Sequence, residues 1–222
     1  MNCTASHTSY LINLAAPDKK KHALSCHALE QELIRSSLLG IPYVVLHPGS
    51  HMGRGETAGI GLIAESVNEV FHHHPDISTR LLIETTAGQG FSIGHTFEQL
   101  AAIMDLVTQR DKIGFCLDSC HIFAAGYDIR TERAYHQTLD AFNAIMGLEH
   151  IYVIHLNDSK KGLGSRVDRH EHIGEGAIGI KAFEFFMKDK RFSQVPKIIE
   201  TPKRKDGKDA DRINLRRLRT LV

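Results

Sequence analysis

Four side chains able to bind a metal or to undergo redox chemistry lie within six residues of one another, in the stretch CLDSCH at 116–121. They are Cys116, Asp118, Cys120 and His121. Three kinds of chemistry are open to such a cluster: a zinc module with thiolate ligands, a redox thiol pair, or a hydrolase that uses the carboxylate and the imidazole. A finger-like zinc site needs a second cysteine pair at matching spacing, which Cys3 and Cys26 do not provide. A redox CxxC motif is not present, since the spacing is CxxxC.

The period of a β-strand determines how these four residues would face. An extended backbone places Cys116, Asp118 and Cys120 on one strand face, with His121 on the loop beyond. We interpret the two cysteines as small buried hydrophobic residues. Asp118 and His121 are then the chemically active pair.

Acidic residues and histidines also end short apolar runs elsewhere in the chain. YVVL leads into His47, LLI into Glu84, GFCL into Asp118, IYVI into His155 and PKII into Glu200. One polar residue at a strand end is ordinary, because the chain returns to water there. Five drawn only from His, Asp and Glu are hard to explain in this way. Parallel α/β folds collect ligand sites at the carboxyl ends of their strands, so the pattern predicts a shared metal-binding face.

A long glycine-rich segment at 155–179 adds two further candidates, and long loops in compact domains are usually functional. Asp168 and His170 are two residues apart, so an extended backbone would point both the same way. The segment is also the most basic part of the chain, which suits phosphate contacts but equally fits a solvated loop. Its cations are Lys160, Lys161, Arg166 and Arg169.

The apolar runs alternate with helical patterns, which predicts an α/β fold with a parallel sheet. We expect strands at 9–14, 43–47, 80–84, 113–118, 151–155 and 195–200. Helices are expected at about 19–39, 57–71, 96–109, 131–147, 179–189 and 210–221. Because no linker or long repeat interrupts the pattern, residues 1–222 are expected to form one domain. A closed (β/α)₈ barrel needs eight strands in about 250 residues, and six are visible.

The composition narrows the function classes. The 222-residue chain carries a formal net charge of +1, so contact with DNA would need a local basic patch. Its 15 histidines favour a metal site, since histidine is the commonest metal ligand. No apolar run reaches about 18 residues and no signal-peptide pattern is present, so we expect a cytoplasmic protein without membrane association.

Long motifs along the whole chain resemble the endonuclease IV family of apurinic/apyrimidinic (AP) endonucleases, also called deoxyribonuclease IV. They are HTSYLINL (7–14), HPGSH (47–51), IETTAGQG (83–90), CLDSCHIFAAGYD (116–128), HLNDSK (155–160), GSRVDRHEHIGEG (164–176) and IIET (198–201). Motifs of this length, in this order, are highly specific.

The resemblance implies a TIM-type (β/α)₈ barrel that holds three zinc ions. The ligands carried over by motif are His7, His47 and Glu84 for the first ion, Glu84, Asp118, His155 and Glu200 for the second, and His121, Asp168 and His170 for the third. Glu84 would therefore bridge two ions, and Asp118 and His121 would serve different ions of one cluster. Mixed imidazole and carboxylate ligands suit zinc, with manganese as the alternative at one or more positions.

The activity implied is DNA repair by hydrolysis of the phosphodiester bond 5′ to an abasic site, which leaves a 3′-hydroxyl and a 5′-deoxyribose phosphate. The metals would lower the pKa of water, clamp the phosphate and stabilise the leaving oxygen. Glu84 would orient the attacking hydroxide. Tyr10 and Leu11 would form a wedge that inserts into duplex DNA, and the basic loop at 160–169 would bind phosphates. The enzyme would be a monomer.

The sequence departs from the family at its start. Family chains carry about two more strands, with their helices, before the HxSYLINL element, whereas Met1 stands six residues before His7. We therefore expect an incomplete barrel that lacks the first two βα units. A fragment of a longer chain, a start codon placed too late and a truncated gene product would each explain this. If the chain is complete, we expect weak metal retention and poor binding of abasic DNA.

Two other functions remain open on the sequence. A divalent-metal sugar isomerase or epimerase on a related barrel would need one or two metals and would have no use for Asp168 and His170. A truncated, inactive metal-binding remnant would bind metal without turnover. Metal content and nicking of a duplex with one abasic analogue separate the three.

Overall fold

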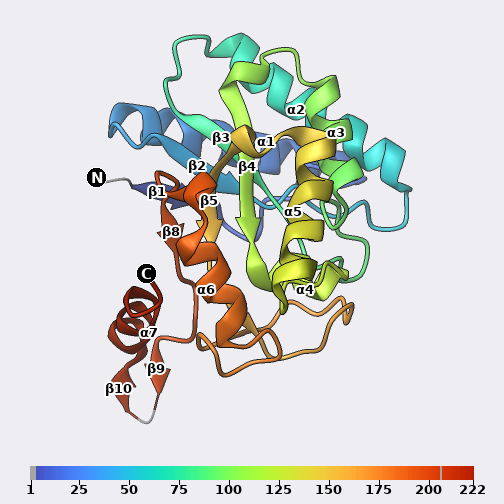
Figure 1. Ribbon diagram of the computed structural model, residues 1–222. Coiled ribbons are helices and arrows are strands. Elements are labelled where there is room, and N and C mark those ends of the chain that lie inside the picture. The colour runs from blue at the N-terminus through green and yellow to red at the C-terminus, as the bar shows by residue number, and fades with distance from the viewer. Residues whose placement is uncertain (1–3, 206) are drawn as a thin grey trace. The chain divides into compact units, whose positions relative to one another are not determined.

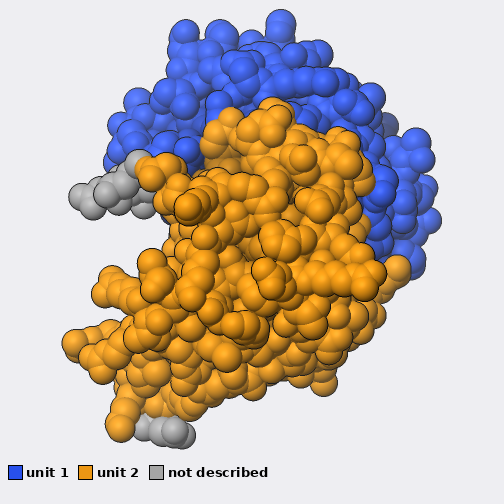
Figure 2. Space-filling view, in the orientation of Figure 1, with its two compact units in different colours: residues 1–85, 90–116 blue, residues 86–89, 117–222 orange. Residues whose placement is uncertain are grey.

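The computed structural model describes residues 4–205 and 207–222, so Cys3 lies outside the described residues. The chain divides into two compact units, which Figure 2 colours separately. The first contains residues 1–85 and 90–116, and the second contains residues 86–89 and 117–222.

A parallel ladder of four strands forms the centre of the first unit (Figure 1). The strands are β1 (Ala5–His7), β2 (Tyr43–Leu46), β3 (Arg80–Glu84) and β4 (Ile113–Asp118), and β4 continues into the second unit. The apolar residues of β2 and β3 are fully buried, as expected for strands covered on both faces. Leu46 pairs with Ile83, and Glu84 pairs with Cys116, so the carboxyl ends of these strands lie in register.

Three helices accompany these strands at the positions that the sequence predicts. They are α1 (Lys19–Leu38), α2 (Glu56–His73) and α3 (Phe97–Leu106), and a short 3₁₀ turn, η1 (Arg110–Lys112), precedes β4. Each of two helices begins at a side-chain cap: Asp18 accepts from the Lys21 N–H at 2.8 Å, and Thr96 accepts from the Gln99 N–H at 3.3 Å. α2 packs against both α1 and α3.

The second unit continues from the end of β4. Its longer strands are β5 (Ile151–His155) and β8 (Lys197–Ile198), which pair in parallel. Its helices are α4 (Ser119–Ala125), α5 (Glu132–Met146), α6 (Ile180–Lys188) and α7 (Ala210–Arg219), with 3₁₀ turns η2 (Leu148–His150) and η3 (Lys190–Phe192). Two short antiparallel pairs complete it: β6 (Asp158–Ser159) with β7 (His170–Glu171), and β9 (Arg204–Lys205) with β10 (Lys208–Asp209). The strand order of the main sheet is β1-β2-β3-β4-β5-β8, six strands as the sequence predicts.

The predicted strand at 9–14 is wrong. The strand lies earlier, at Ala5–His7, and the chain turns immediately after it. The Ile12 N–H donates to the Ser9 carbonyl at 3.0 Å, and the Asn13 side chain accepts from the Ala15 N–H at 3.1 Å. Asn side chains compete with a strand ladder in this way, and here the local bonds prevail.

Two further elements differ from expectation. Only Lys197–Ile198 of the predicted strand at 195–200 is extended in a ladder, which fits the missing N–H of Pro196. A helix, α4, starts directly at Ser119 because the Asp118 side chain accepts from the His121 N–H at 2.8 Å. Cys120 and His121 therefore lie in the first turn of a helix, and the prediction that Cys120 shares a strand face with Asp118 is wrong. None of the described helices is long and apolar enough to cross a membrane.

Candidate metal centre

Three side chains from consecutive strands converge in the first unit. His7 ends β1, His47 follows β2 directly, and Glu84 ends β3. The same carboxylate oxygen, Oε2 of Glu84, lies 3.0 Å from Nε2 of His7 and 2.8 Å from Nε2 of His47. Glu84 is fully buried, whereas both histidine side chains are 23% exposed, so the group opens to solvent on the histidine side.

The tautomer of His7 bears on what this group can bind. Its Nδ1 lies 2.8 Å from the Thr8 carbonyl oxygen, so Nδ1 carries a hydrogen and donates it. In a neutral ring, the Nε2 lone pair then faces the Glu84 carboxylate, and two acceptors would oppose each other. The arrangement calls for a cation between them, which is either a second proton on the imidazole or a metal ion. A histidine whose other ring nitrogen is fixed by a carbonyl is the usual arrangement of a metal ligand.

A second group of three lies in the second unit. His121 comes from the first turn of α4, Asp168 from the 160–169 loop and His170 from β7. Nε2 of His121 lies 3.3 Å from Asp168 Oδ2 and 3.4 Å from His170 Nε2. Nε2 of His170 lies 3.4 Å from Asp168 Oδ1.

These spacings fit a zinc ion. Ligand atoms about 2.0–2.2 Å from a tetrahedral zinc lie about 3.3 Å from one another. The two histidine Nε2 atoms lie 3.4 Å apart, as on one edge of such a tetrahedron, and each lies 3.3 or 3.4 Å from a different oxygen of Asp168. His170 is also oriented in the same way as His7, since its Nδ1 lies 3.2 Å from the Glu200 carbonyl oxygen and directs Nε2 toward the group.

The remaining predicted ligands of the second unit also meet. Nδ1 of His155 lies 3.1 Å from Glu200 Oε2 and 3.8 Å from Asp118 Oδ2. Nε2 of His170 lies 3.9 Å from the same Asp118 oxygen. All six predicted ligands of this unit therefore form one continuous cluster. Glu84 belongs to the other compact unit, so its predicted role as a bridging ligand remains a prediction.

A buried polar network holds this cluster. The Asn157 side chain donates to Asp118 Oδ2 at 2.6 Å and accepts from the Glu200 N–H at 2.7 Å. This pattern fixes the orientation of the amide, because a flipped amide would place donor against donor. The Ser119 hydroxyl accepts from the Asn157 N–H at 2.9 Å, which ties the end of β5 to the start of α4. Asn157 thus links the segments after β4, β5 and β8.

The cysteines of the CLDSCH stretch are fully buried. Burial, with Asp118 nearby, raises the pKa of the Cys120 thiol to about 12, so the group is protonated at neutral pH. Its Sγ lies 3.8 Å from the Arg169 carbonyl oxygen. Cys120 Sγ also lies within 4.8 Å of ligand atoms of Asp118 and His170, so it is the protonated state of the thiol that favours a packing role for Cys120. For Cys116 the packing interpretation rests on its burial. The three histidines at 72–74 supply no ligand to any converging metal-capable group in the described part of the chain, and His74 instead pairs with Glu30 at 2.7 Å.

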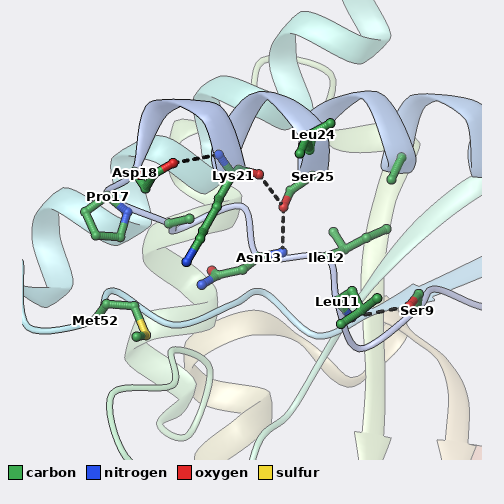
Figure 3. Close-up of a pocket in the computed structure, with 12 residues that line it drawn as sticks. Ser9, Leu11, Ile12, Asn13, Pro17, Asp18, Lys21, Leu24, Ser25 and Met52 are labelled. Carbon is green, nitrogen blue, oxygen red and sulfur yellow. Dashed lines mark hydrogen bonds between the residues drawn. The ribbon is translucent and has the colours of Figure 1, made fainter.

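The predicted wedge residues lie on the exposed turn after β1. Tyr10 is 74% exposed and Leu11 is 90% exposed, while the Tyr10 ring contacts His47 with the centroids 5.5 Å apart. Leu11 also borders an apolar groove of about 630 Å³, into which the Lys21 side chain extends from α1 (Figure 3). Leu24 and Met52 continue the lining, so Leu11 is part of a larger apolar surface.

The four cations of the basic loop are all exposed. They are Lys160, Lys161, Arg166 and Arg169. The loop is attached to α4 by the Arg166 N–H, which donates to the Ala124 carbonyl at 2.9 Å. Arg166 has a left-handed backbone with φ 53°, which is uncommon for a residue with a side chain.

Comparison with known proteins places the chain in a family. The sequence matches a family model described as "Xylose isomerase-like TIM barrel" over residues 1–221. A protein named "Probable endonuclease 4" from Geobacter sulfurreducens is 49% identical over 217 residues, which cover 98% of this chain and 73% of that protein. The chain belongs to the endonuclease IV family. Membership of the endonuclease IV family confirms the TIM-barrel fold class and the expectation of a metal-dependent nuclease.

Further proteins of the endonuclease IV family resemble this chain in sequence and in structure. A "Probable endonuclease 4" from Chloroflexus aurantiacus is 48% identical over 216 residues, covering 97% of this chain and 75% of that protein. The crystal structure of endonuclease IV from Thermus thermophilus superimposes with a TM-score of 0.83 at 37% identity and covers 99% of this chain and 75% of that one. A D-tagatose 3-epimerase-like protein superimposes with a TM-score of 0.74 at 18% identity, which shows the shared fold alone.

The residues that sequence reasoning missed hold the ligands rather than supply them. Asn157 and Asp158 follow β5 inside the HLNDSK motif of the endonuclease IV family resemblance, and both are fully buried. Two adjacent polar residues without exposure are unusual, but the sequence does not reveal burial at a strand end. Their partners, Glu200 and the turn at 176–179, lie far away in the chain.

Proposed function

We propose that this protein is an AP endonuclease that hydrolyses the phosphodiester bond 5′ to an abasic site in duplex DNA. The products would be a 3′-hydroxyl and a 5′-deoxyribose phosphate, with three zinc ions as cofactors and manganese as the alternative at some positions. The observation that carries the proposal is the triangle of His121, Asp168 and His170. Its two histidine Nε2 atoms have the spacing of two ligands of one zinc ion, and a different Asp168 oxygen lies beside each of them, in a chain of the endonuclease IV family.

The proposed ligands can be assigned to three ions. His7, His47 and Glu84 would hold one ion, and His121, Asp168 and His170 another. Asp118, His155 and Glu200 would hold the third ion together with Glu84, whose bridging part rests on the family resemblance alone. Bound cations supply positive charge that neutralises the phosphodiester and lowers the pKa of water.

The residues of the chain would supply orientation and access. The Glu84 carboxylate, buried and fixed by His7 and His47, would orient the attacking hydroxide. Tyr10 and Leu11 are exposed enough to enter the stack of a duplex, where an abasic sugar is easily extruded because no base has to be unstacked. The exposed cations of the 160–169 loop would bind phosphate oxygens.

Metal content and nicking test the proposal together. The zinc-loaded chain should cut a labelled duplex on the 5′ side of a single tetrahydrofuran residue, and a polymerase should extend the new 3′ end. An identical duplex without the lesion should stay intact. His170→Ala should lose one zinc per chain. His150→Ala should retain all of them, because His150 is a half-buried histidine of η2 that belongs to none of the converging metal-capable groups of the described residues. Fewer than two metals per chain with no nicking at any salt concentration would contradict the proposal.

Three further properties belong to the same proposal. The chain would act as a monomer, which sedimentation tests, and residues 1–222 would unfold as a single domain, which calorimetry tests. A cytoplasmic location would show as co-fractionation with other cytoplasmic enzymes.

A further inference from the structure

The side chain of Asp158 is fully buried, and among residues 4–205 and 207–222 its hydrogen-bond partners are all backbone N–H groups. Oδ1 accepts from the N–H groups of Ser159 at 2.8 Å and Ile178 at 3.0 Å. Oδ2 accepts from the N–H groups of Gly176 at 3.0 Å and Gly179 at 3.3 Å. An ionised carboxylate has about four acceptor sites, so these four amides saturate it.

The turn at 176–179 is shaped to receive this carboxylate. Gly176 packs so closely that a Cβ there would collide with the Ser159 carbonyl oxygen and the Asp158 carboxylate. Gly179, with φ 79°, precedes α6, so its bond to Asp158 also fixes the start of that helix. The Ala177 N–H donates to the Ser159 carbonyl at 2.8 Å and closes the contact.

The strand that carries Asp158, β6, pairs with the strand that carries the proposed metal ligand His170, β7. In the β6–β7 pair, Asp158 is in register with Glu171 and Ser159 with His170. The Lys160 N–H donates to the Arg169 carbonyl at 2.9 Å and extends the pairing toward Asp168. The strand that presents His170 is thus paired with β6, and β6 is in turn fastened to the 176–179 turn by the Asp158 carboxylate and the Ser159 carbonyl.

We infer that Asp158 is a positioning residue for Asp168 and His170, which it holds in place by tying the 176–179 turn to β6. Asp158 itself belongs to none of the converging metal-capable groups of the described residues. The inference rests on the proposed function, because it assigns Asp158 to the retention of one of the three proposed ions.

Asp158→Asn is the informative variant. An asparagine keeps one oxygen for Ser159 and Ile178, but its NH₂ group faces the N–H groups of Gly176 and Gly179, donor against donor. The matched control is Asp189→Asn, which removes a carboxylate that binds Arg191 and Tyr135 elsewhere in the same unit. Both variants should lose stability. A difference between them in zinc content or in the geometry of His170 therefore reports the positioning of the ligands and not a general loss of folding.

Zinc content after dialysis against a weak chelator is the first measurement. Asp158→Asn should retain two of three zinc ions and Asp189→Asn all three. Amide exchange at Gly176, Ile178 and Gly179 should accelerate at least tenfold in Asp158→Asn alone. The inference is overturned if Asp158→Asn retains its zinc with wild-type affinity.

A metal-free measurement separates this inference from the proposed function. Nε2 of His121 and Nε2 of His170 lie 3.4 Å apart, so a ring-proton Overhauser effect should connect them in the apo chain. Asp158→Asn should lose the effect, and Asp189→Asn should keep it. If the wild type binds fewer than three metals but these effects behave as expected, the proposed function fails and the positioning role stands. An unchanged effect in Asp158→Asn overturns the positioning role whatever the metal content. If Asp158→Asn does not fold, Gly176→Ala, which disturbs the same contact from the other side, decides by the same two readouts.

Discussion

Replacing Asn157 by leucine should destabilise the apo chain and weaken metal binding together. Asn157 is fully buried, and leucine has nearly the same shape, so the change removes two hydrogen bonds and leaves little cavity. One bond, at 2.6 Å, is donated to the Asp118 carboxylate, and the other, at 2.7 Å, is accepted from the Glu200 N–H.

The size of the effect follows from these two bonds. A hydrogen bond to a charged group contributes about 1.5–3 kcal/mol, and a neutral one about 1 kcal/mol. We therefore expect a loss of about 2.5–4 kcal/mol in the free energy of unfolding, a large part of the roughly 5–15 kcal/mol typical of a domain. Because both partners are proposed ligands, zinc affinity should also fall by about 10–100-fold, as for other residues that orient metal ligands.

Urea unfolding of the EDTA-treated chain measures the first quantity, and competition with a zinc-binding dye measures the second. Asn143→Leu is the matched control, because Asn143 is an exposed asparagine whose side chain accepts from the Leu148 N–H at 3.1 Å, a bond remote from the proposed ligands. It should change neither quantity appreciably. The reasoning is refuted if Asn157→Leu loses less than about 1 kcal/mol, or if it loses stability while zinc affinity stays at the wild-type value.

Three other outcomes are expected. Leu11→Ala should raise KM for the abasic duplex about tenfold without lowering the melting temperature, because Leu11 is 90% exposed, and Leu38→Ala, at 83% exposure, should change neither. Lys160→Ala should reduce by about one the slope of the logarithm of DNA affinity against the logarithm of salt concentration, and an unchanged slope would remove Lys160 from the phosphate contacts. Hydrogen bonds from Lys181 and Lys188 lower the pKa of Glu184 to about 2. The ionised Glu184 should therefore stabilise the fold above about pH 4.5, and this stabilisation should be lost as the pH falls toward 2. A carboxyl NMR titration of Lys181→Ala should show the Glu184 midpoint move upward, and an unmoved midpoint would contradict the assignment.

The elements whose cores are continuous apolar runs could be predicted from the sequence almost to the residue. The strands at 80–84, 113–118 and 151–155 have their predicted bounds, because such runs are stable only when buried between layers. The strand at 9–14 was misplaced because its apolar letters include Asn13, whose side chain bonds the local backbone and Ser50 instead of a ladder. Helix α4 was missed because its start depends on Asp118 acting as a cap, while the same residue also fits the end of a strand.

The proposed ligands were visible in the sequence because they share a chemical type and follow strands. The residues that hold them were not, since what distinguishes Asn157 or Asp158 from an ordinary loop residue is the identity of a distant partner. Asn157 meets Glu200 across 43 residues, and Asp158 meets Gly179 across 21. Such pairings are a property of the fold rather than of any local pattern.

The two oxygens of Asp118 have separate tasks, and this restricts what evolution can place there. Oδ1 caps α4 through the His121 N–H, while Oδ2 receives the Asn157 amide and faces His155. Asparagine could still accept the hydrogen bond from the His121 N–H at the start of α4, but it would lack the negative charge. Glutamate would keep the charge on a longer side chain that caps poorly, and histidine could bind a metal but not the helix end. None of these three residues can therefore replace both functions of Asp118. In a library of all single substitutions at position 118 selected for metal-dependent activity, we expect only aspartate to be retained.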